Sequence, residues 1–343
     1  MKNYSVFLLC LLLTGSVSTP ILWETMVVSA IPIFAPARPA RFALDSSLPL
    51  TVEINAPASD PAPQVERVII VSYDGMRPDA IAAAPMPNLL GLIDNGAYTL
   101  TNAVTIAYPS TLPSHAAMLS GLCMEKNGIV YDKYYKYMGY SKGVDLFDLA
   151  HASGMRTVMI VGKDKLRQLA EPETTDVFEI RYDEAAIAQA AVEQISQGFG
   201  VMFVHFPSPD QVGHKYEWMG YSYLEILRSG DEALGQILAA LDNNGLREST
   251  LVIITADHGG HDKNHIGLVI EDFMIPWIAS GARVVPGEID ASLQTMDTAA
   301  TAAYALGLPL QPDWDGIPVF EAFGETRTQF HEYDVNWPCH AWN

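Results

Sequence analysis

Carboxylate and histidine side chains lie directly after three apolar runs of the sequence. The runs are residues 67–73, 201–206 and 250–256, and the side chains that follow them belong to Asp74, Asp210, His214, Asp257, His258, His261 and His265. If these loops converge, so many like charges require a counter-charge. Divalent cations would supply it, and a mixed set of Asp and His ligands suits zinc best. The residue types therefore predict a metal site.

The apolar runs have the composition of buried strands. Residues 67–73 read RVIIVSY and residues 250–256 read TLVIITA, and residues 157–161 and 201–206 have the same character. Helical patterns lie between them, such as the Ala-rich residues 183–197. Strands that are apolar on both faces and separated by helices predict a parallel sheet covered on both sides. Such sheets bind ligands at the carboxyl ends of their strands, where the three loops would meet.

Each motif also has a purely structural interpretation. An Asp after a strand, such as Asp74, often caps a helix. Asp210 and His214 have the i, i+4 spacing of an ordinary pair on a helix face. Their joint occurrence at three strand ends favours a metal site over three unrelated structural roles.

A hydroxyl side chain lies between two prolines in the sequence YPSTLPSH. Pro113 fits the first turn of a helix, and Thr111 would lie just ahead of that helix. Free N–H groups and the helix dipole favour an anion at such a position, so Thr111 could attack a bound phosphate. A threonine that only caps the helix would have the same sequence. These residues alone leave both roles open.

The bulk composition indicates a folded, acidic protein. The chain has 343 residues, enough for one large or two ordinary domains, and 49% of them are apolar. The formal net charge of −20 argues against a nucleic-acid polymer as partner, because phosphate backbones bind to basic surfaces. A small phosphate ester remains compatible, since bound cations reverse the local field. The composition assigns no oligomeric state.

The N-terminus has the features of an export signal. Lys2 provides a positive charge, residues 6–13 are apolar, and small polar residues follow to residue 19. The apolar run is too short to span a bilayer, so we expect no stable membrane span after cleavage. An uncleaved anchor is the alternative. The expected location is therefore periplasmic or secreted.

Six strings of the sequence match a known pattern in order and spacing. They are YDGMRPD, MPNLLGLIDNGAYT, YPSTLPSHAAMLSGL, NGIVYD, HFPSPDQVGHKY and TADHGGHDKNH. With these strings, from about residue 68 to residue 323, the sequence resembles the alkaline phosphatase superfamily, and most closely the type I phosphodiesterase and nucleotide pyrophosphatase family. The resemblance implies an alkaline-phosphatase-like α/β fold, a three-layer sandwich around a mainly parallel sheet with little or no cap domain.

The resemblance also implies a site with two divalent metal ions, usually zinc. The ligands expected for the first ion are Asp74, Thr111, Asp257 and His258. Those expected for the second are Asp210, His214 and a later histidine, for which His265 is the first choice, His261 the alternative, and His331 or His340 more distant ones. Thr111 would attack phosphorus and carry the phosphoryl group as a phospho-threonine, without a general-base histidine beside it.

Two charged residues are candidate substrate-binding residues. Asp132 stands where many relatives have an Asn that donates to a phosphoryl oxygen. An ionised carboxylate there would repel phosphate unless it is protonated, turned away or bound to a further cation, and Lys133 or Asn127 would then be the donor. Lys163 lies in a region where some relatives bind phosphate or phosphonate, and a solvated surface lysine is the alternative.

Other residues near these motifs have less specific interpretations. His115 is expected to pack behind Thr111 or orient its helix, and His205, within an apolar run, is expected to be a core histidine. Five tyrosines could line a pocket for an organic group or form an exposed loop, namely Tyr131, Tyr134, Tyr135, Tyr137 and Tyr140.

The resemblance implies hydrolysis of phosphodiesters or nucleotide pyrophosphates, with a small phosphate ester as substrate. A metal-dependent phosphomonoesterase of the same fold is the alternative, and a non-catalytic metal-binding protein is favoured only by Asp132. A sulfatase is disfavoured because Thr111 cannot be converted to formylglycine, and Cys123 lacks the Pro and Arg of a sulfatase motif.

Four segments follow from this organisation. They are a signal peptide over residues 1–19, a Pro/Ala-rich arm or linker over 20–64, an alkaline-phosphatase-like catalytic domain over 65–325 and a C-terminal tail over 326–343. Cys123 and Cys339 remain after the signal, and export permits either a disulfide between them or two free thiols.

Overall fold

The computed structural model describes residues 65–267 and 269–331, and these are built around an eight-stranded sheet. The strand order across the sheet is β5-β4-β6-β1-β7-β8-β2-β9. In chain order the strands are β1 (Arg67–Tyr73), β2 (Ala97–Thr99), β4 (Thr157–Val161), β5 (Val177–Ile180), β6 (Val201–Phe206), β7 (Thr250–Thr255), β8 (Trp277–Gly281) and β9 (Gly287–Glu288). A separate two-stranded sheet pairs β3 (Ala103–Val104) with β10 (Leu293–Gln294).

The four apolar runs that the sequence analysis identified form the central strands, and they are parallel. Val68 of β1 pairs with Val201 of β6 on one side and with Leu251 of β7 on the other. Every residue of β4, β6 and β7 is buried, as expected for strands covered on both faces. The other four strands of this sheet, β2, β5, β8 and β9, were not identified from the sequence. Among them, β8 runs antiparallel to β7 and begins the antiparallel side of the sheet.

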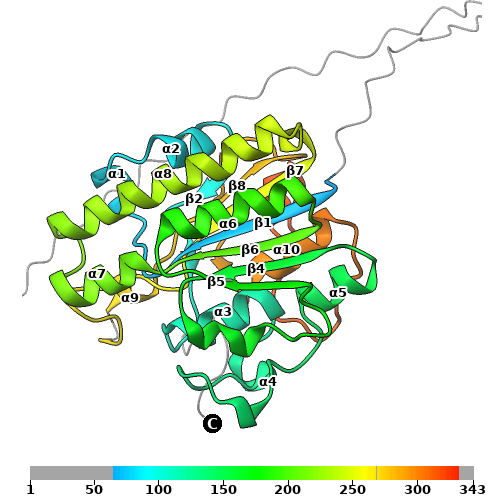
Figure 1. Cartoon of the computed structure of the whole chain (residues 1–343), viewed down its shortest axis with the longest axis horizontal. Coiled ribbons are helices and arrows are strands. Elements are labelled where there is room, and N and C mark those ends of the chain that lie inside the picture. Colours follow the sequence, from blue (N-terminus) through cyan, green and yellow to red (C-terminus); the bar gives the residue numbers. More distant parts are fainter. Residues whose placement is uncertain (1–64, 268, 332–343) are drawn as a thin grey trace, which may run out of the picture. The chain divides into compact units, whose positions relative to one another are not determined.

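Helices cover both faces of the sheet and complete the predicted three layers. Figure 1 shows α6 and α8 on one face and α3, α5 and α10 on the other. The α-helices are α1 (Ala80–Ala83), α2 (Pro87–Asp94), α3 (Thr111–Ser120), α4 (Met124–Asn127), α5 (Leu146–Ala152), α6 (Glu184–Gln197), α7 (Ser208–Tyr216), α8 (Tyr221–Asn243), α9 (Ile270–Phe273) and α10 (Asp297–Ala305). The described residues belong to one compact unit, consistent with little or no cap domain.

Local sequence explains where the two longest helices begin and which face they bury. Asp183 accepts a hydrogen bond from the N–H of Ala186 and so caps α6. In α8, Leu227, Leu234 and Leu241 recur at helical spacing and are fully buried. Both helices pack against the sheet through such faces, so the α/β layering follows from the pattern of apolar residues.

The described part of the predicted C-terminal tail contacts the domain. Arg327 pairs with Glu321, and His331 Nε2 lies 2.8 Å from Asp297 Oδ1 at the start of α10. The predicted signal peptide and arm lie outside the described residues, as does Cys339. Cys123 is disulfide-bonded. Among the described residues, no helix is both long and apolar enough to cross a membrane.

Candidate active site

The carboxyl ends of three neighbouring parallel strands carry the predicted acidic residues. Asp74 directly follows β1, Asp210 lies in α7 just after β6, and Asp257 follows β7. Because β6, β1 and β7 are adjacent in the sheet, their loops meet at one edge, as predicted. The N–H of Gly75 donates to Asp257 Oδ1 over 3.0 Å and joins the first of these loops to the last.

Six Asp and His side chains converge at this edge, and we call them the donor cluster. They are Asp74, Asp210, His214, Asp257, His258 and His265. Two groups in this cluster bring their ligand atoms within 4.8 Å of one another, namely Asp210 with His214 and His265, and Asp74 with Asp210 and His258. Asp257 adjoins the second group, since its Oδ2 lies 3.4 Å from His258 Nε2. Asp210 therefore belongs to both groups and links them.

Four buried atoms of the donor cluster have no hydrogen-bond partner among the described residues. They are Asp74 Oδ1, Asp210 Oδ1, Asp257 Oδ2 and His258 Nε2. Nitrogen Nε2 of His258 lies 3.6 Å from Asp74 Oδ1 and 4.0 Å from Asp210 Oδ1, so these atoms face one another. Leaving one such group unpaired costs about 1–3 kcal/mol, and four in one place call for a ligand. Carboxylate oxygens with imidazole nitrogens suit a divalent metal ion.

Backbone carbonyls fix the tautomers of the three histidines in the donor cluster. Nδ1 of His258 lies 2.8 Å from Gly259 O, that of His214 lies 2.9 Å from a backbone carbonyl, and that of His265 lies 2.6 Å from Pro109 O. Since a carbonyl only accepts, each Nδ1 carries the proton and each Nε2 keeps its lone pair. All three Nε2 atoms lie within 4.0 Å of Asp210 Oδ1. The histidines are thus oriented as metal ligands before any metal binds.

Burial gives the donor cluster unusual acid–base properties. Burial and the charge of Asp74 raise the pKa of Asp257 to about 7. Burial also opposes ionisation of Asp74, but Lys163 and a hydrogen bond from His205 hold the pKa of Asp74 well below its usual value. Burial lowers the pKa of His265 to about 3, so this imidazole is neutral at pH 7, which is the form that binds metals.

Thr111 is the first residue of α3, and its hydroxyl accepts a hydrogen bond from Lys163, which also contacts Asp74 and Asp210 of the donor cluster. Thr111 is buried, with 2% of its surface exposed. His115 Nδ1 donates to the backbone carbonyl of Thr111 over 2.7 Å, and its Nε2 lies 2.8 Å from Ser72 Oγ on β1. His115 thus ties the start of α3 to the central strand, which is the orienting role expected from the sequence.

Lys163 places an ammonium group inside the donor cluster. It follows β4, its side chain is 13% exposed, and the interpretation as a solvated surface lysine is wrong. Its Nζ lies 2.7 Å from Asp74 Oδ2, 2.5 Å from Asp210 Oδ2 and 3.1 Å from Thr111 Oγ1. Burial would lower the pKa of Lys163, but the two carboxylates raise it above its ordinary value. The ammonium therefore counters two of the three buried carboxylates.

His205 supports Asp74 and was missed as a residue of the site. It is fully buried in β6, as expected for a core histidine, but it also has a specific partner. The N–H of Gly162 donates to its Nδ1, so its Nε2 carries the proton and donates to Asp74 Oδ2 over 2.8 Å. The available signal was a histidine within an otherwise apolar strand that neighbours the strand of Asp74.

Asp132 does not turn away from the nucleophile. Its Oδ1 accepts a hydrogen bond of 2.9 Å from the N–H of Leu112, the residue after Thr111. Its Oδ2 lies 2.7 Å from Lys165 Nζ, so the cation beside it is Lys165, a residue that the sequence analysis did not identify. Asn127 is instead buried at the end of α4, where its amide donates to Leu122 O.

The alternative histidine ligands lie away from the donor cluster. His261 Nδ1 lies 2.7 Å from Asp272 Oδ1, which anchors the loop that carries it. His331 pairs with Asp297 at the start of α10, and His340 lies outside the described residues. Among the described candidates, His265 is the one whose ligand atom groups with Asp210 and His214. In the 131–140 loop, the ring of Tyr135 contacts those of Tyr131 and Tyr137, and Tyr137 is 80% exposed.

The indole of Trp218 packs against glycines from three loops of the site. A Cβ atom added at Gly75, Gly213 or Gly260 would lie 3.3 Å, 2.6 Å or 2.3 Å from this ring. Gly75 also has a φ of +72°, which disfavours any side chain. The indole N–H donates to Gly75 O over 2.8 Å. Gly75, Gly213 and Gly260 therefore share one packing partner, whereas a Cβ atom at Gly259 would clash with Glu271 O.

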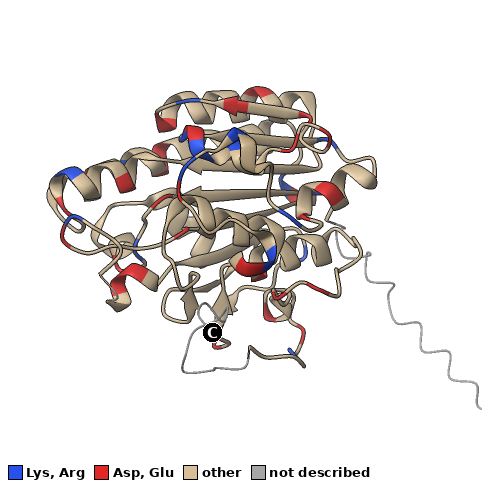
Figure 2. Ribbon diagram, turned by 90° about the horizontal axis from the view of Figure 1, so that it is seen from below, with Lys and Arg blue, Asp and Glu red and all other residues tan. Residues whose placement is uncertain are grey.

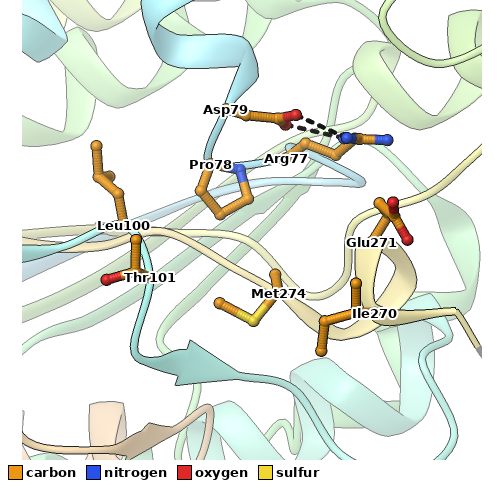
Figure 3. Close-up of a pocket in the computed structure, with 8 residues that line it drawn as sticks. All are labelled: Arg77, Pro78, Asp79, Leu100, Thr101, Ile270, Glu271 and Met274. Carbon is orange, nitrogen blue, oxygen red and sulfur yellow. Dashed lines mark hydrogen bonds and ion pairs between the residues drawn. The ribbon is translucent and has the colours of Figure 1, made fainter.

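A cavity of about 450 Å³ lies beside the site and contains none of its donors. Figure 3 shows Arg77 in this cavity, paired with Asp79 through two hydrogen bonds. Arg77 also donates to Gly260 O over 3.1 Å, so it supports the loop of His258 from behind. Figure 2 shows acidic and basic residues interspersed over the described domain rather than gathered into one basic band. That distribution agrees with a small substrate.

Comparison with known proteins identifies relatives of this chain. The profile of the type I phosphodiesterase / nucleotide pyrophosphatase family matches residues 68–276. A bis(5'-adenosyl)-triphosphatase of Xenopus laevis, enpp4, is 23% identical over 216 residues, which cover 56% of this chain and 47% of that protein. The chain thus spans about half the length of the curated relatives that it matches.

Solved structures share the fold at low sequence identity. Murine ectonucleotide pyrophosphatase / phosphodiesterase 5 superposes with a TM-score of 0.59 and 13% identity, over 72% of this chain and 96% of that one. A 2-O glycosaminoglycan sulfatase superposes with a TM-score of 0.64 and 17% identity, over 79% and 76%. The fold is therefore the one shared by these enzymes, as the resemblance implied. Because the family profile covers more than half of the sequence and includes the strands that carry the donor cluster, the chain belongs to the type I phosphodiesterase / nucleotide pyrophosphatase family.

Proposed function

We propose that the chain hydrolyses phosphodiesters or nucleotide pyrophosphates by attack of Thr111 on phosphorus. The observation that carries this proposal is the set of four unpaired, buried atoms of the donor cluster. The cluster is joined to the Thr111 hydroxyl by Lys163, whose Nζ contacts Asp74, Asp210 and Thr111 Oγ1. The names of two related proteins also support the proposal. One is called a bis(5'-adenosyl)-triphosphatase, and a murine relative with a threonine-to-alanine change is described as inactive and in complex with AMP.

Two divalent metal ions, with zinc as the expected metal, complete the proposed site. The residues that would hold them are Asp74, Thr111, Asp257 and His258 for one ion and Asp210, His214 and His265 for the other. Bound ions would stabilise the negative charge that develops on the phosphoryl and leaving oxygens. The orphaned donor atoms and the fixed histidine tautomers support this ligand set.

The residues around Thr111 prepare its oxygen for attack. Lys163 Nζ donates to Thr111 Oγ1, so a positive charge lies beside the oxygen that must lose its proton. Thr111 also begins α3, whose dipole favours the same negative charge. His115 bonds to the Thr111 carbonyl and leaves the hydroxyl free for phosphorus. Attack would form a bond between Thr111 Oγ1 and phosphorus and break the bond from phosphorus to the leaving-group oxygen, which departs as an alcohol or phosphate. The resulting phospho-threonine keeps the other substituent of the substrate, and water would then hydrolyse it and regenerate the hydroxyl.

The proposed substrate is a small phosphate ester outside the cytoplasm. The sequence of residues 1–19 supports export, and the acidic net charge of −20 disfavours a nucleic-acid polymer. A phosphomonoesterase of the same fold is the close alternative, because the donor cluster would serve a monoester equally well. Comparing a monoester with a diester substrate separates the two.

The test measures turnover and bound metal in the same samples. Hydrolysis of bis-p-nitrophenyl phosphate should fall about a thousandfold or more in Thr111→Ala, while Thr111→Ser, which keeps the hydroxyl, should retain part of it. Metal content should stay close to wild type in Thr111→Ala, because three donors to that ion remain. Exhaustive chelation should abolish activity, and zinc should restore it.

Each outcome has a defined meaning. Full activity in Thr111→Ala would remove this residue from the mechanism. Activity that survives chelation would exclude the metal site as its source. Faster hydrolysis of p-nitrophenyl phosphate than of the diester would favour the phosphomonoesterase, and failure with both esters despite bound metal would favour a non-catalytic protein.

A further inference from the structure

A carboxylate accepts a hydrogen bond from the backbone N–H of the residue that follows the nucleophile. The N–H of Leu112 donates to Asp132 Oδ1 over 2.9 Å. The first turn of α3 has few such groups to offer, because Pro113 has no N–H and the N–H of Ser114 donates to Ser110 O over 3.0 Å. A phosphoryl oxygen on Thr111 would therefore meet Asp132 at a position where an anion would otherwise bind.

Lys165 holds Asp132 in this place. Its Nζ lies 2.7 Å from Asp132 Oδ2, and the two side chains are 23% and 29% exposed. Lys163, two residues earlier, turns instead to Asp74 and Asp210. The sequence KDK thus directs one ammonium into the donor cluster and the other to the carboxylate on α3. The Asp132–Lys165 pair is part of the reaction site, yet it borders solvent and a substrate can reach it.

The charge of the phosphoryl group decides how well it tolerates this carboxylate. A phosphomonoester has three terminal oxygens and a charge of about −2 near neutral pH, since its second pKa is about 6. A diester, or the phosphorus of a pyrophosphate that carries a nucleoside, has two terminal oxygens and one charge. Where the diester has an uncharged ester group, the monoester has a third charged oxygen. When phosphorus is bound at Thr111, this third oxygen is the one that would face Asp132. Repulsion by Asp132 is therefore larger for the monoester.

We propose that Asp132 is a specificity-determining residue that selects singly charged phosphoryl groups over doubly charged ones. Diesters and nucleotide pyrophosphates belong to the first class, and phosphomonoesters and orthophosphate to the second. The inference rests on the proposed function, and it identifies which phosphate esters that site accepts.

The test replaces Asp132 by its neutral isostere. In Asp132→Asn, the ratio of kcat/KM for p-nitrophenyl phosphate to that for bis-p-nitrophenyl phosphate should rise about tenfold or more, and orthophosphate should inhibit at about tenfold lower concentration. Lys165→Met should shift the ratio the other way, because the carboxylate then lacks its counter-ion. Asp164→Asn is the charge-matched control, since Asp164 directly precedes Lys165, its side chain is 69% exposed and it pairs with Arg167.

The outcomes separate the inference from the proposed function. If the wild type hydrolyses the diester, and Asp132→Asn changes neither the ratio nor the orthophosphate inhibition, only the inference is wrong. An equal change in Asp164→Asn would show a general charge effect and would also overturn it. If the wild type hydrolyses neither ester, the proposed function fails. Calorimetric binding of orthophosphate to the zinc-loaded wild type and to Asp132→Asn then decides, and equal affinities contradict the inference.

Discussion

Asp74, Asp210 and Asp257 are fixed by the ends of buried strands, whereas Asp132 and Lys165 are fixed mainly by each other. The side chains of Asp74 and Asp257 have no exposed surface, but those of Asp132 and Lys165 are 29% and 23% exposed. One side of the site is therefore part of the core, and the other borders solvent. The comparison indicates that the sheet fixes the ligand geometry, while the loops beside it can adjust to the substrate.

The largest expected effect separates two histidines of the same loop. His258→Ala should weaken zinc binding by more than the roughly 10–100-fold typical of residues that only orient ligands, because it removes one of the converging Nε2 atoms. His261→Ala is the matched control. Its ring bonds to Asp272, so it should bind zinc nearly normally but unfold at a lower temperature. Calorimetry measures the zinc affinity of each variant, and thermal unfolding measures its stability. Similar zinc affinities in the two variants would contradict the assignment of His258 as a ligand and His261 as a structural residue.

A smaller effect on zinc affinity is expected at Lys163, whose ammonium contacts two buried carboxylates of the donor cluster. Lys163→Met removes an ammonium 2.7 Å from Asp74 Oδ2, so we expect zinc to bind about tenfold more tightly. The metal-free protein should unfold at a lower temperature, since two buried carboxylates lose their neighbouring cation. Zinc titration and unfolding of the same variant test both changes. Weaker zinc binding would show that Lys163 supports the metal rather than competing with it.

The smallest effect concerns pH and the metal-free protein. Asp257 keeps its proton up to about pH 7 when folded, but an unfolded Asp loses it near pH 4. The folded state thus binds more protons in this window, and the free energy of unfolding should fall as pH rises from about 4 to about 7.

Comparison with Asp257→Asn isolates this contribution. The variant should show a shallower decline of Tm between pH 5 and pH 7, by about a few degrees. Asp145, whose pKa burial also raises to about 7, remains in both proteins and cancels in the difference. Identical slopes would show that Asp257 is ionised in the folded, metal-free state.

Much of the fold and of the donor cluster could be predicted from the sequence. The strands around Asp74, Asp210 and Asp257 are continuous apolar runs, and their parallel order brings the loops together without knowledge of any side-chain contact. His265 was preferred over His261 through the family resemblance, and the structure shows why the loop separates them. His261 bonds to Asp272, whereas His265 bonds to Pro109 O and turns its Nε2 inward.

Lys163 and Asp132 were candidates from the resemblance, but their contacts, like the role of His205, could not be predicted because they depend on partners that are distant in the sequence. His205 and Asp74 are 131 positions apart, and only the register of β6 beside β1 brings them into contact. Lys163 resembles a surface lysine until the end of β4 is placed next to the acidic loops. Asp132 lies in an irregular loop, and Lys165 lies in a short 3-10 helix (Asp164–Leu169) that is 33 positions further along the chain, so no sequence periodicity indicates their contact.

The shared packing of three glycines against Trp218 constrains how this site can evolve or be redesigned. Enlarging any one of Gly75, Gly213 or Gly260 displaces the same indole, so a harmful change in one loop is felt by the other two. Substitutions at Gly213 and Gly260 should therefore be epistatic, and a smaller residue in place of Trp218 could compensate either one, whereas the positive φ of Gly75 would still disfavour a side chain there. A segment transferred from a relative should therefore be tolerated only if Trp218 and the three glycines are all retained.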